Sequence, residues 1–143
     1  MKEKAFETQQ DIDNELEVIK KFAEFKNCNY VKMKRFFKVD FALYDKISDE
    51  LDSLVEIKCT PNSDSLFTNQ RISTKKIKAM KEFAIANQCP AYLVYRYSDL
   101  TRWADVNDLD GEEFIGGWNK PREGSVNDIE PMWEFPKSQM KIL

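Results

Sequence analysis

The sequence of 143 residues contains no histidine. No imidazole is therefore available as a general base, a nucleophile or a metal ligand. This excludes Ser-His-Asp and Cys-His hydrolases, zinc sites that use histidine, and nucleases that depend on histidine. A metal ion in this protein would have to be a hard cation on oxygen ligands, such as Mg²⁺, Mn²⁺ or Ca²⁺. Acid–base chemistry falls to carboxylates, lysine or tyrosine.

Cysteines are few, and long hydrophobic runs are missing. Cys28, Cys59 and Cys89 stand about thirty residues apart, their number is odd, and no CxxC pair occurs. This spacing favours reduced thiols in a cytoplasmic protein. The first ten residues have no apolar stretch, and no run approaches eighteen apolar residues, so we expect neither a signal peptide nor a membrane span.

Glycine and proline are scarce until late in the chain. All four glycines fall between Gly111 and Gly124, and three of the five prolines lie at or after Pro121. Because glycine and proline interrupt regular structure, we expect a compact core over about residues 8–106 and a loop-rich extension over about 107–143. Both parts are expected to form one domain, residues 1–143.

The remaining composition is that of a folded domain. Hydrophobic residues make up 42% and aromatic residues 13%, which is enough for a core. The net charge is −3. A net negative charge by itself argues against a nucleic-acid binder, but net charge is a weak guide where the charges are segregated along the chain.

Hydrophobic periodicity predicts an α-β-β-β-α-β-β order. The predicted helices span residues 8–26, with Thr8 as N-cap, and 71–87. The predicted strands span residues 30–37, 39–44, 53–59, 91–97 and 101–106, with a turn at 45–52 and a loop at 60–69. This order predicts an α/β (α+β) fold with a central mixed sheet flanked by helices.

Three charged residues interrupt apolar strands. Glu56 and Lys58 alternate with Leu54 on one face of the segment LVEIKC, and Asp40 lies between Val39 and Phe41. An edge strand with a solvated face, or a simple Glu–Lys pair, would explain part of this. Charged residues are seldom buried without a partner or a function, and aspartate disfavours strands, so a functional cluster is the stronger interpretation.

Each predicted helix also places a charged residue within its apolar face. With Ile12 at 0° and 100° per residue, Glu15 lies at about 300°, inside the apolar arc, whereas Glu17 lies on the polar face. In the second helix, Lys76 falls inside the apolar arc. Lys76 either extends past the core to solvent or points toward a site.

These residues together resemble the PD-(D/E)XK nuclease superfamily. The matching segments are VDFALYD and LVEIKCT, and the element order resembles the αβββαβ core of the restriction-endonuclease-like fold. The chain most resembles small single-domain members of the phage-encoded and Holliday-junction-resolvase-like types. One departure is Val39, which stands where the motif has proline.

The resemblance implies a site and a mechanism. Asp40 and Glu56, with the backbone carbonyl of Ile57, would hold one or two Mg²⁺ (or Mn²⁺) ions, and Glu15 would serve as an outer or second-metal carboxylate. Lys58 would orient or deprotonate the attacking water. Lys76 would match the Gln or Lys that members of the superfamily often place near the site in this helix.

Basic residues gather in two segments, residues 32–38 and 69–81, neither of which contains an acidic residue. Most such lysines simply face solvent. A basic rim around a carboxylate site would also suit a phosphate backbone, and we assign this contact to Lys34, Arg35, Arg71 and Lys75. No module that reads bases is evident, so these contacts would position DNA without selecting a sequence.

The sequence thus predicts a metal-dependent DNA endonuclease, with branched or structured DNA among its candidate substrates. The alternatives are a catalytically silent DNA-binding or assembly protein of the same fold, and an exonuclease or RNA-directed nuclease. One domain offers one active site, so we expect a homodimer where two strands are cut. A cytoplasmic location, with the protein encoded by a bacterial host or a phage, is expected.

Overall fold

The computed structural model describes residues 8–34, 39–117 and 129–143. The first helix, α1 (Gln9–Phe25), begins at the predicted N-cap. The Thr8 hydroxyl accepts from the Asp11 N–H at 3.1 Å, and the Asp11 carboxylate accepts from the Thr8 N–H at 3.0 Å. This capping box satisfies two N–H groups that a helix start leaves without partners. Val18, Ile19, Phe22 and Ala23 are buried, as the helical periodicity predicts.

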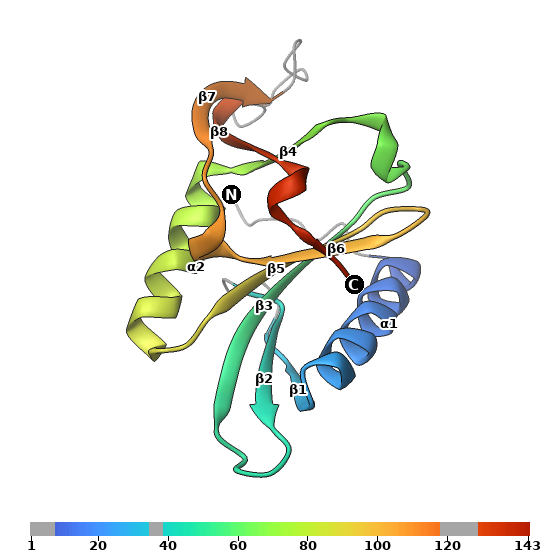
Figure 1. The fold of residues 1–143 in the computed structure, drawn as a ribbon, viewed down its shortest axis with the longest axis vertical. Helices are drawn as coiled ribbons and strands as arrows, with labels where there is room; N and C mark the ends of the chain where they lie inside the picture. The colour runs from blue at the N-terminus through green and yellow to red at the C-terminus, as the bar shows by residue number, and fades with distance from the viewer. Residues whose placement is uncertain (1–7, 35–38, 118–128) are drawn as a thin grey trace.

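A six-stranded sheet forms the centre of the protein (Figure 1). Its order is β1-β2-β3-β5-β6-β9, and β3 and β5 pair in parallel while the other neighbours pair antiparallel. The strands are β1 (Cys28–Lys32), β2 (Phe41–Asp45), β3 (Leu51–Cys59), β5 (Ala91–Arg96), β6 (Thr101–Asp105) and β9 (Lys141–Ile142). The predicted mixed sheet is confirmed.

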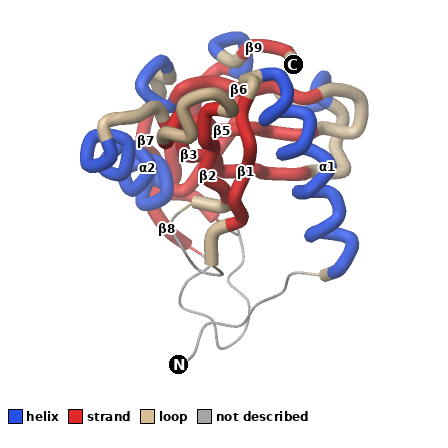
Figure 2. Tube along the Cα trace, turned by 90° about the horizontal axis from the view of Figure 1, so that it is seen from below, coloured by secondary structure: helices blue, strands red, loops and turns tan. Residues whose placement is uncertain are grey.

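The two helices cover opposite faces of this sheet (Figure 2). Val55 and Ile57 of β3 pack in one core cluster with the buried side of α1. Leu54 of β3 packs in a second cluster with Ile77 and Met80 of α2 (Thr74–Asn87). Alternation along β3 therefore turns Glu56 and Lys58 toward the α2 side. No helix in the described ranges is long and apolar enough to cross a membrane.

A second, three-stranded sheet stands beside α2, in the order β4-β8-β7. It consists of β4 (Asn69–Ser73), β7 (Glu112–Gly117) and β8 (Ile129–Pro136). Short 3₁₀ helices η1 (Asp64–Leu66), η2 (Val106–Asp108) and η3 (Lys137–Gln139) connect elements of the two sheets.

This second sheet corrects two predictions. In the predicted loop-rich extension at about 107–143, residues 112–117 and 129–136 form strands β7 and β8. Pro131 pairs with β7 alone and Pro136 with β4 alone, so each missing N–H can face away from the ladder. Residues 71–73 belong to β4 rather than to the helix, because the Ser73 hydroxyl caps α2 by accepting from the Lys76 N–H. The remaining predicted elements begin and end within a few residues of those observed, and residues 35–38 of the first predicted strand lie outside the described residues.

Candidate active site

The candidate site lies where β2 and β3 separate. Their pairing ends at Phe41 and Val55, and β3 continues beside β5 up to Cys59. The Asp40 N–H still donates to the Val55 carbonyl at 3.0 Å. Two residues further along β3, the Ile57 N–H donates to the Asp40 Oδ2 atom at 2.8 Å. The Asp40 carboxylate thus takes the place of a strand neighbour at the opening between β2 and β3.

The same hydrogen bond fixes the direction of the Ile57 carbonyl. Within a strand, the N–H and C=O of one residue point to the same side. Because the Ile57 N–H points to Asp40, its carbonyl oxygen also faces the opening between β2 and β3. The predicted ligand atom is therefore directed toward the same opening as the Asp40 carboxylate.

Glu56 is the charged group of this site that lies deepest, with 3% of its surface exposed. Its Oε2 atom lies 3.3 Å from Lys58 Nζ, and its Oε1 atom lies 3.5 Å from Lys76 Nζ. Burial and then the negative charge of Asp40 raise the pKa of Glu56, and the two lysines counter this shift without cancelling it. The structure therefore brings together Asp40, Glu56, Lys58 and Lys76.

Glu15 belongs to the other side of the sheet. It projects from α1, the helix that packs on the Val55 and Ile57 face of β3, opposite to Glu56. Its carboxylate forms an ion pair of 3.0 Å with Lys32 Nζ of β1. Among the residues that the structure describes, no three acidic or cysteine side chains converge as a metal site. Glu15 as a metal ligand stays a prediction.

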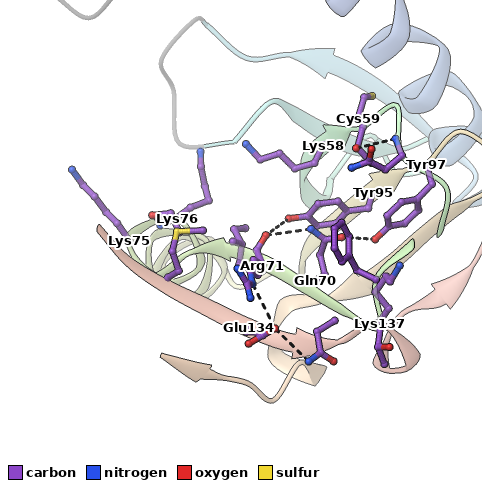
Figure 3. A pocket seen from close by; sticks show the side chains of 18 of the residues that line it. Lys58, Cys59, Gln70, Arg71, Lys75, Lys76, Tyr95, Tyr97, Glu134 and Lys137 are labelled. Atoms are coloured by element: carbon purple, nitrogen blue, oxygen red, sulfur yellow. Dashed lines mark hydrogen bonds and ion pairs between the residues drawn. The ribbon is translucent and has the colours of Figure 1, made fainter. Parts of the chain in front are cut away.

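A cleft with a volume of about 1230 Å³ adjoins this site (Figure 3). The residues that line it come from β4, α2, β8 and the ends of β3 and β5. Six of its lining side chains are cationic, against two glutamates. The cations are Lys58, Arg71, Lys75, Lys76, Lys78 and Lys137. Lys58 and Lys76 also contact Glu56, so they join the cleft to the carboxylates.

The predicted DNA contacts fall in different places. Arg71 and Lys75 line the cleft, with Arg71 on β4 and Lys75 in the first turn of α2. Arg71 is further held by Glu134, whose Oε1 atom lies 3.5 Å from Arg71 Nε. Lys34 is exposed just after β1 and is not part of the cleft lining. Arg35 lies outside the described residues.

Sequence reasoning missed the aromatic floor of the cleft. The Tyr97 hydroxyl donates to Gln70 Oε1 at 2.6 Å, and the Tyr95 hydroxyl donates to the Arg71 carbonyl at 3.1 Å. The two rings stack, with centroids 6.1 Å apart. The available signal was alternation, because Leu93, Tyr95 and Tyr97 follow each other on the face that Glu56 shares.

Sequence reasoning also missed a cluster of ion pairs around Lys137, which lines the cleft. The Asp64 carboxylate accepts two hydrogen bonds from Arg102, at 2.8 and 2.9 Å, and lies 3.6 Å from Lys137 Nζ. Lys137 is 5% exposed and also donates to the Asp64 carbonyl. The Arg102 hydrogen bonds lower the pKa of Asp64. We call Asp64, Arg102 and Lys137 the Asp64 clasp. It joins the loop before β4 to the segment after β8.

Two solved structures share this architecture. The Holliday junction resolvase Hjc from the archaeal hyperthermophile Archaeoglobus fulgidus superposes with a TM-score of 0.57 at 12% identity. That match covers 92% of this chain and 88% of the other. D212, a nuclease from a fusselovirus, superposes with a TM-score of 0.55 at 12% identity over 99% of this chain and 91% of the other. At this identity the likeness establishes the fold, which is restriction-endonuclease-like.

No curated protein sequence matches the chain. A family model described as "Phage putative PDDEXK endonuclease" matches residues 1–143. The match agrees with the motif residues Asp40, Glu56 and Lys58, which the fold brings to one place. The chain belongs to this family of phage PD-(D/E)XK endonucleases.

Proposed function

We propose that the protein is a divalent-metal-dependent DNA endonuclease that hydrolyses phosphodiester bonds. The observation that carries this proposal is that two carboxylates, Asp40 and Glu56, lie close enough to repel each other where β2 and β3 separate. Burial and the negative charge of Asp40 both disfavour ionisation of Glu56. A divalent cation between the two carboxylates would relieve both costs.

The donor set fits Mg²⁺ or Mn²⁺. Asp40, Glu56 and the Ile57 carbonyl would hold the ion, and they supply oxygen atoms alone. Mg²⁺ binds proteins through one or two carboxylates and keeps several waters, so two carboxylates and a carbonyl suffice. When bound, the ion would polarise the phosphate and activate a water.

The two lysines have separate roles in this proposal. Both contact Glu56, but the Lys58 side chain is 45% exposed and the Lys76 side chain 28% exposed. Lys58 projects from the same strand as Glu56 and would hold the attacking water or receive its proton. Lys76 comes from the first turn of α2 and would hold a phosphate oxygen on the cleft side. Glu15 would act as an outer or second-metal carboxylate.

The cationic cleft supports DNA as the substrate. Arg71 and Lys75 would neutralise backbone phosphates there, and Lys34 and Arg35 would extend the contact beyond β1. Such contacts position DNA without reading its sequence. The structural likeness to a Holliday junction resolvase makes a four-way junction a necessary member of any substrate panel. Cutting two strands together would require a homodimer.

The decisive experiment compares wild-type protein with Asp40→Asn on supercoiled plasmid, linear duplex and a four-way junction, in Mg²⁺, in Mn²⁺ and in EDTA. Loss of a metal ligand should slow cleavage by roughly three orders of magnitude, because the metal supplies several kcal/mol to the transition state. Nicking of closed circles by the wild type would identify an endonuclease and exclude a purely exonucleolytic enzyme.

Asp49→Asn is the matched control. Asp49 is exposed at the β2–β3 turn and has a positive φ of 58°, a conformation that asparagine tolerates well. Its cleavage rate should equal that of the wild type. Equal rates for Asp40→Asn and wild type would attribute the cleavage to a contaminant. Metal-independent binding without any cleavage would instead favour the catalytically silent DNA-binding protein.

A further inference from the structure

Phe67 is a large aromatic residue at the edge of the cleft that the proposed catalytic chemistry does not use. It follows η1 directly, lines the cleft, and leaves 62% of its surface exposed. Leu66 beside it is 57% exposed. Exposed apolar side chains are common on protein surfaces when they stand alone. An exposed ring at the edge of a strongly cationic cleft is a different case, because both features suit one ligand.

The backbone on both sides of Phe67 is fixed. Before it, Asp64 is held by the clasp, and its N–H donates to the Asp99 carboxylate at 2.9 Å. After it, the Thr68 carbonyl accepts from the Lys137 N–H at 3.1 Å. The backbone that carries the ring is therefore ordered before a ligand binds, so binding loses little conformational entropy in this loop.

Cations and aromatic rings along one groove are the combination that binds single-stranded nucleic acid. Basic side chains follow the backbone, while rings stack on bases regardless of sequence. In a duplex the faces of the bases are covered by their neighbours, so a ring can stack on an unpaired base but not on a paired one. The cleft volume of about 1230 Å³ also exceeds the roughly 300–1,000 Å³ of pockets for small molecules.

We infer that the cleft takes an unpaired stretch of DNA, with Phe67 stacked on one of its bases and the cleft lysines on its phosphates. The inference rests on the proposed function for the identity of the nucleic acid. It narrows the substrate to DNA that has a single-stranded portion beside the bond to be cut, such as a flap, a gap or an opened branch.

The test is a binding measurement in EDTA, where no metal-dependent cleavage occurs. Fluorescence anisotropy would follow titration of a labelled single strand of about 12 nucleotides, and of the duplex of the same length, with full-length protein. The wild type should prefer the single strand. Phe67→Ala should weaken single-strand binding by about 5- to 150-fold, the effect of losing one base–aromatic stack. Duplex binding should change less than about twofold, since no stack on a duplex is proposed.

Two further variants separate stacking from general damage. Phe67→Tyr keeps the ring and should bind like the wild type. Ile85→Ala removes an apolar side chain of 76% exposure from the far part of α2, outside the cleft, and should also bind like the wild type. Urea denaturation of all variants would verify equal folding.

A direct readout of stacking completes the test. A 2-aminopurine base in the single strand should lose fluorescence on binding the wild type and Phe67→Tyr, and keep it with Phe67→Ala. The inference is overturned if the protein shows no preference for the single strand, or if Phe67→Ala lowers both affinities equally or neither. Tighter binding of an RNA strand of the same sequence would overturn the assignment to DNA.

This inference and the proposed function fail separately. Absence of metal-dependent cleavage by the wild type would refute the nuclease proposal, while a Phe67-dependent preference for single strands would still stand. Conversely, cleavage that Asp40→Asn abolishes, together with indifference to Phe67, would retain the nuclease and reject the single-strand cleft.

Discussion

Glu56 and Asp64 each have two cationic partners, and lysines that line the cleft are among them, yet the pKa values of the two carboxylates move in opposite directions. Glu56 lies 3.3 Å from Lys58 and 3.5 Å from Lys76, and its pKa is raised. Asp64 lies 2.8 Å from Arg102 and 3.6 Å from Lys137, and its pKa is lowered.

The difference lies in geometry and in neighbours. Arg102 holds Asp64 through two parallel hydrogen bonds, which match a carboxylate better than a lysine does. Glu56 is more deeply buried, its lysine contacts of 3.3 and 3.5 Å are longer than the Arg102 hydrogen bonds of Asp64, and a second carboxylate, Asp40, adds repulsion. The charge of Asp64 is therefore balanced by its partners within the chain. In the Glu56 cluster, which consists of Asp40, Glu56, Lys58 and Lys76, a further positive charge would still lower the energy of the ionised carboxylates.

The largest effect should come from breaking the clasp. Arg102→Met should lower the free energy of unfolding by about 3 kcal/mol, since it leaves a mostly buried carboxylate without its main partner. Urea denaturation measures this. Arg96→Met is the matched control, because Arg96 pairs at 3.2 Å with Glu17, whose side chain is 69% exposed, and should cost less than about 1 kcal/mol. Similar losses for both variants would show that the clasp is no stronger than a surface pair.

An intermediate effect of opposite sign should come from Glu56. In EDTA, Glu56→Gln should raise the free energy of unfolding by about 1 kcal/mol, because it removes a buried charge and its repulsion with Asp40. Lys58 and Lys76 are partly exposed and keep water contacts in this variant.

Adding Mg²⁺ sharpens that result. At about 100 times the dissociation constant, Mg²⁺ should stabilise the wild type by about 2.7 kcal/mol and Glu56→Gln far less. Thermal denaturation with and without the metal measures both. If Glu56→Gln destabilised the protein in EDTA, Glu56 would belong with Asp64 as a structural carboxylate.

The smallest expected effect is on the free energy of unfolding at acidic pH. Because the folded-state pKa of Asp64 lies below its ordinary value of 3.8, its ionised form stabilises the fold above that pH. This contribution is lost as the pH falls below 3.8 and through the folded-state pKa. Unfolding free energies measured down the acid range should therefore fall more steeply for the wild type than for Asp64→Asn. Some slope should persist in the variant, since the pKa values of Asp45 and Asp99 are lowered as well.

The central sheet and the Glu56 cluster could be predicted from sequence because they produce periodic signals. Glu56 and Lys58 stand out as charges in an apolar strand, and their alternation fixes their face. The helical phase between Lys76 and Met80 does not depend on where the helix starts, so a predicted helix that begins three residues early still puts Lys76 on the side of α2 that faces Glu56.

The cleft and the clasp could not be predicted in this way. Gln70 and Tyr97 are 27 residues apart, and Asp64 and Lys137 are 73 residues apart. No periodic pattern links such pairs. Strand β8 was missed because its prolines suggested a loop, and without β8 there is no reason to bring Lys137 near Asp64. The aromatic floor was visible as an apolar strand, but its hydroxyl partners come from β4, which was also missed.

Because β4 pairs with β8, which lies near the end of the chain, the second sheet can be completed only late in synthesis. Chains emerge and fold from the N-terminus. All five predicted catalytic residues have been made by Lys76, whereas the wall that β8 gives the cleft starts at Ile129, and the clasp waits for Lys137. A nascent chain thus carries the proposed catalytic residues well before the proposed DNA-binding cleft is complete.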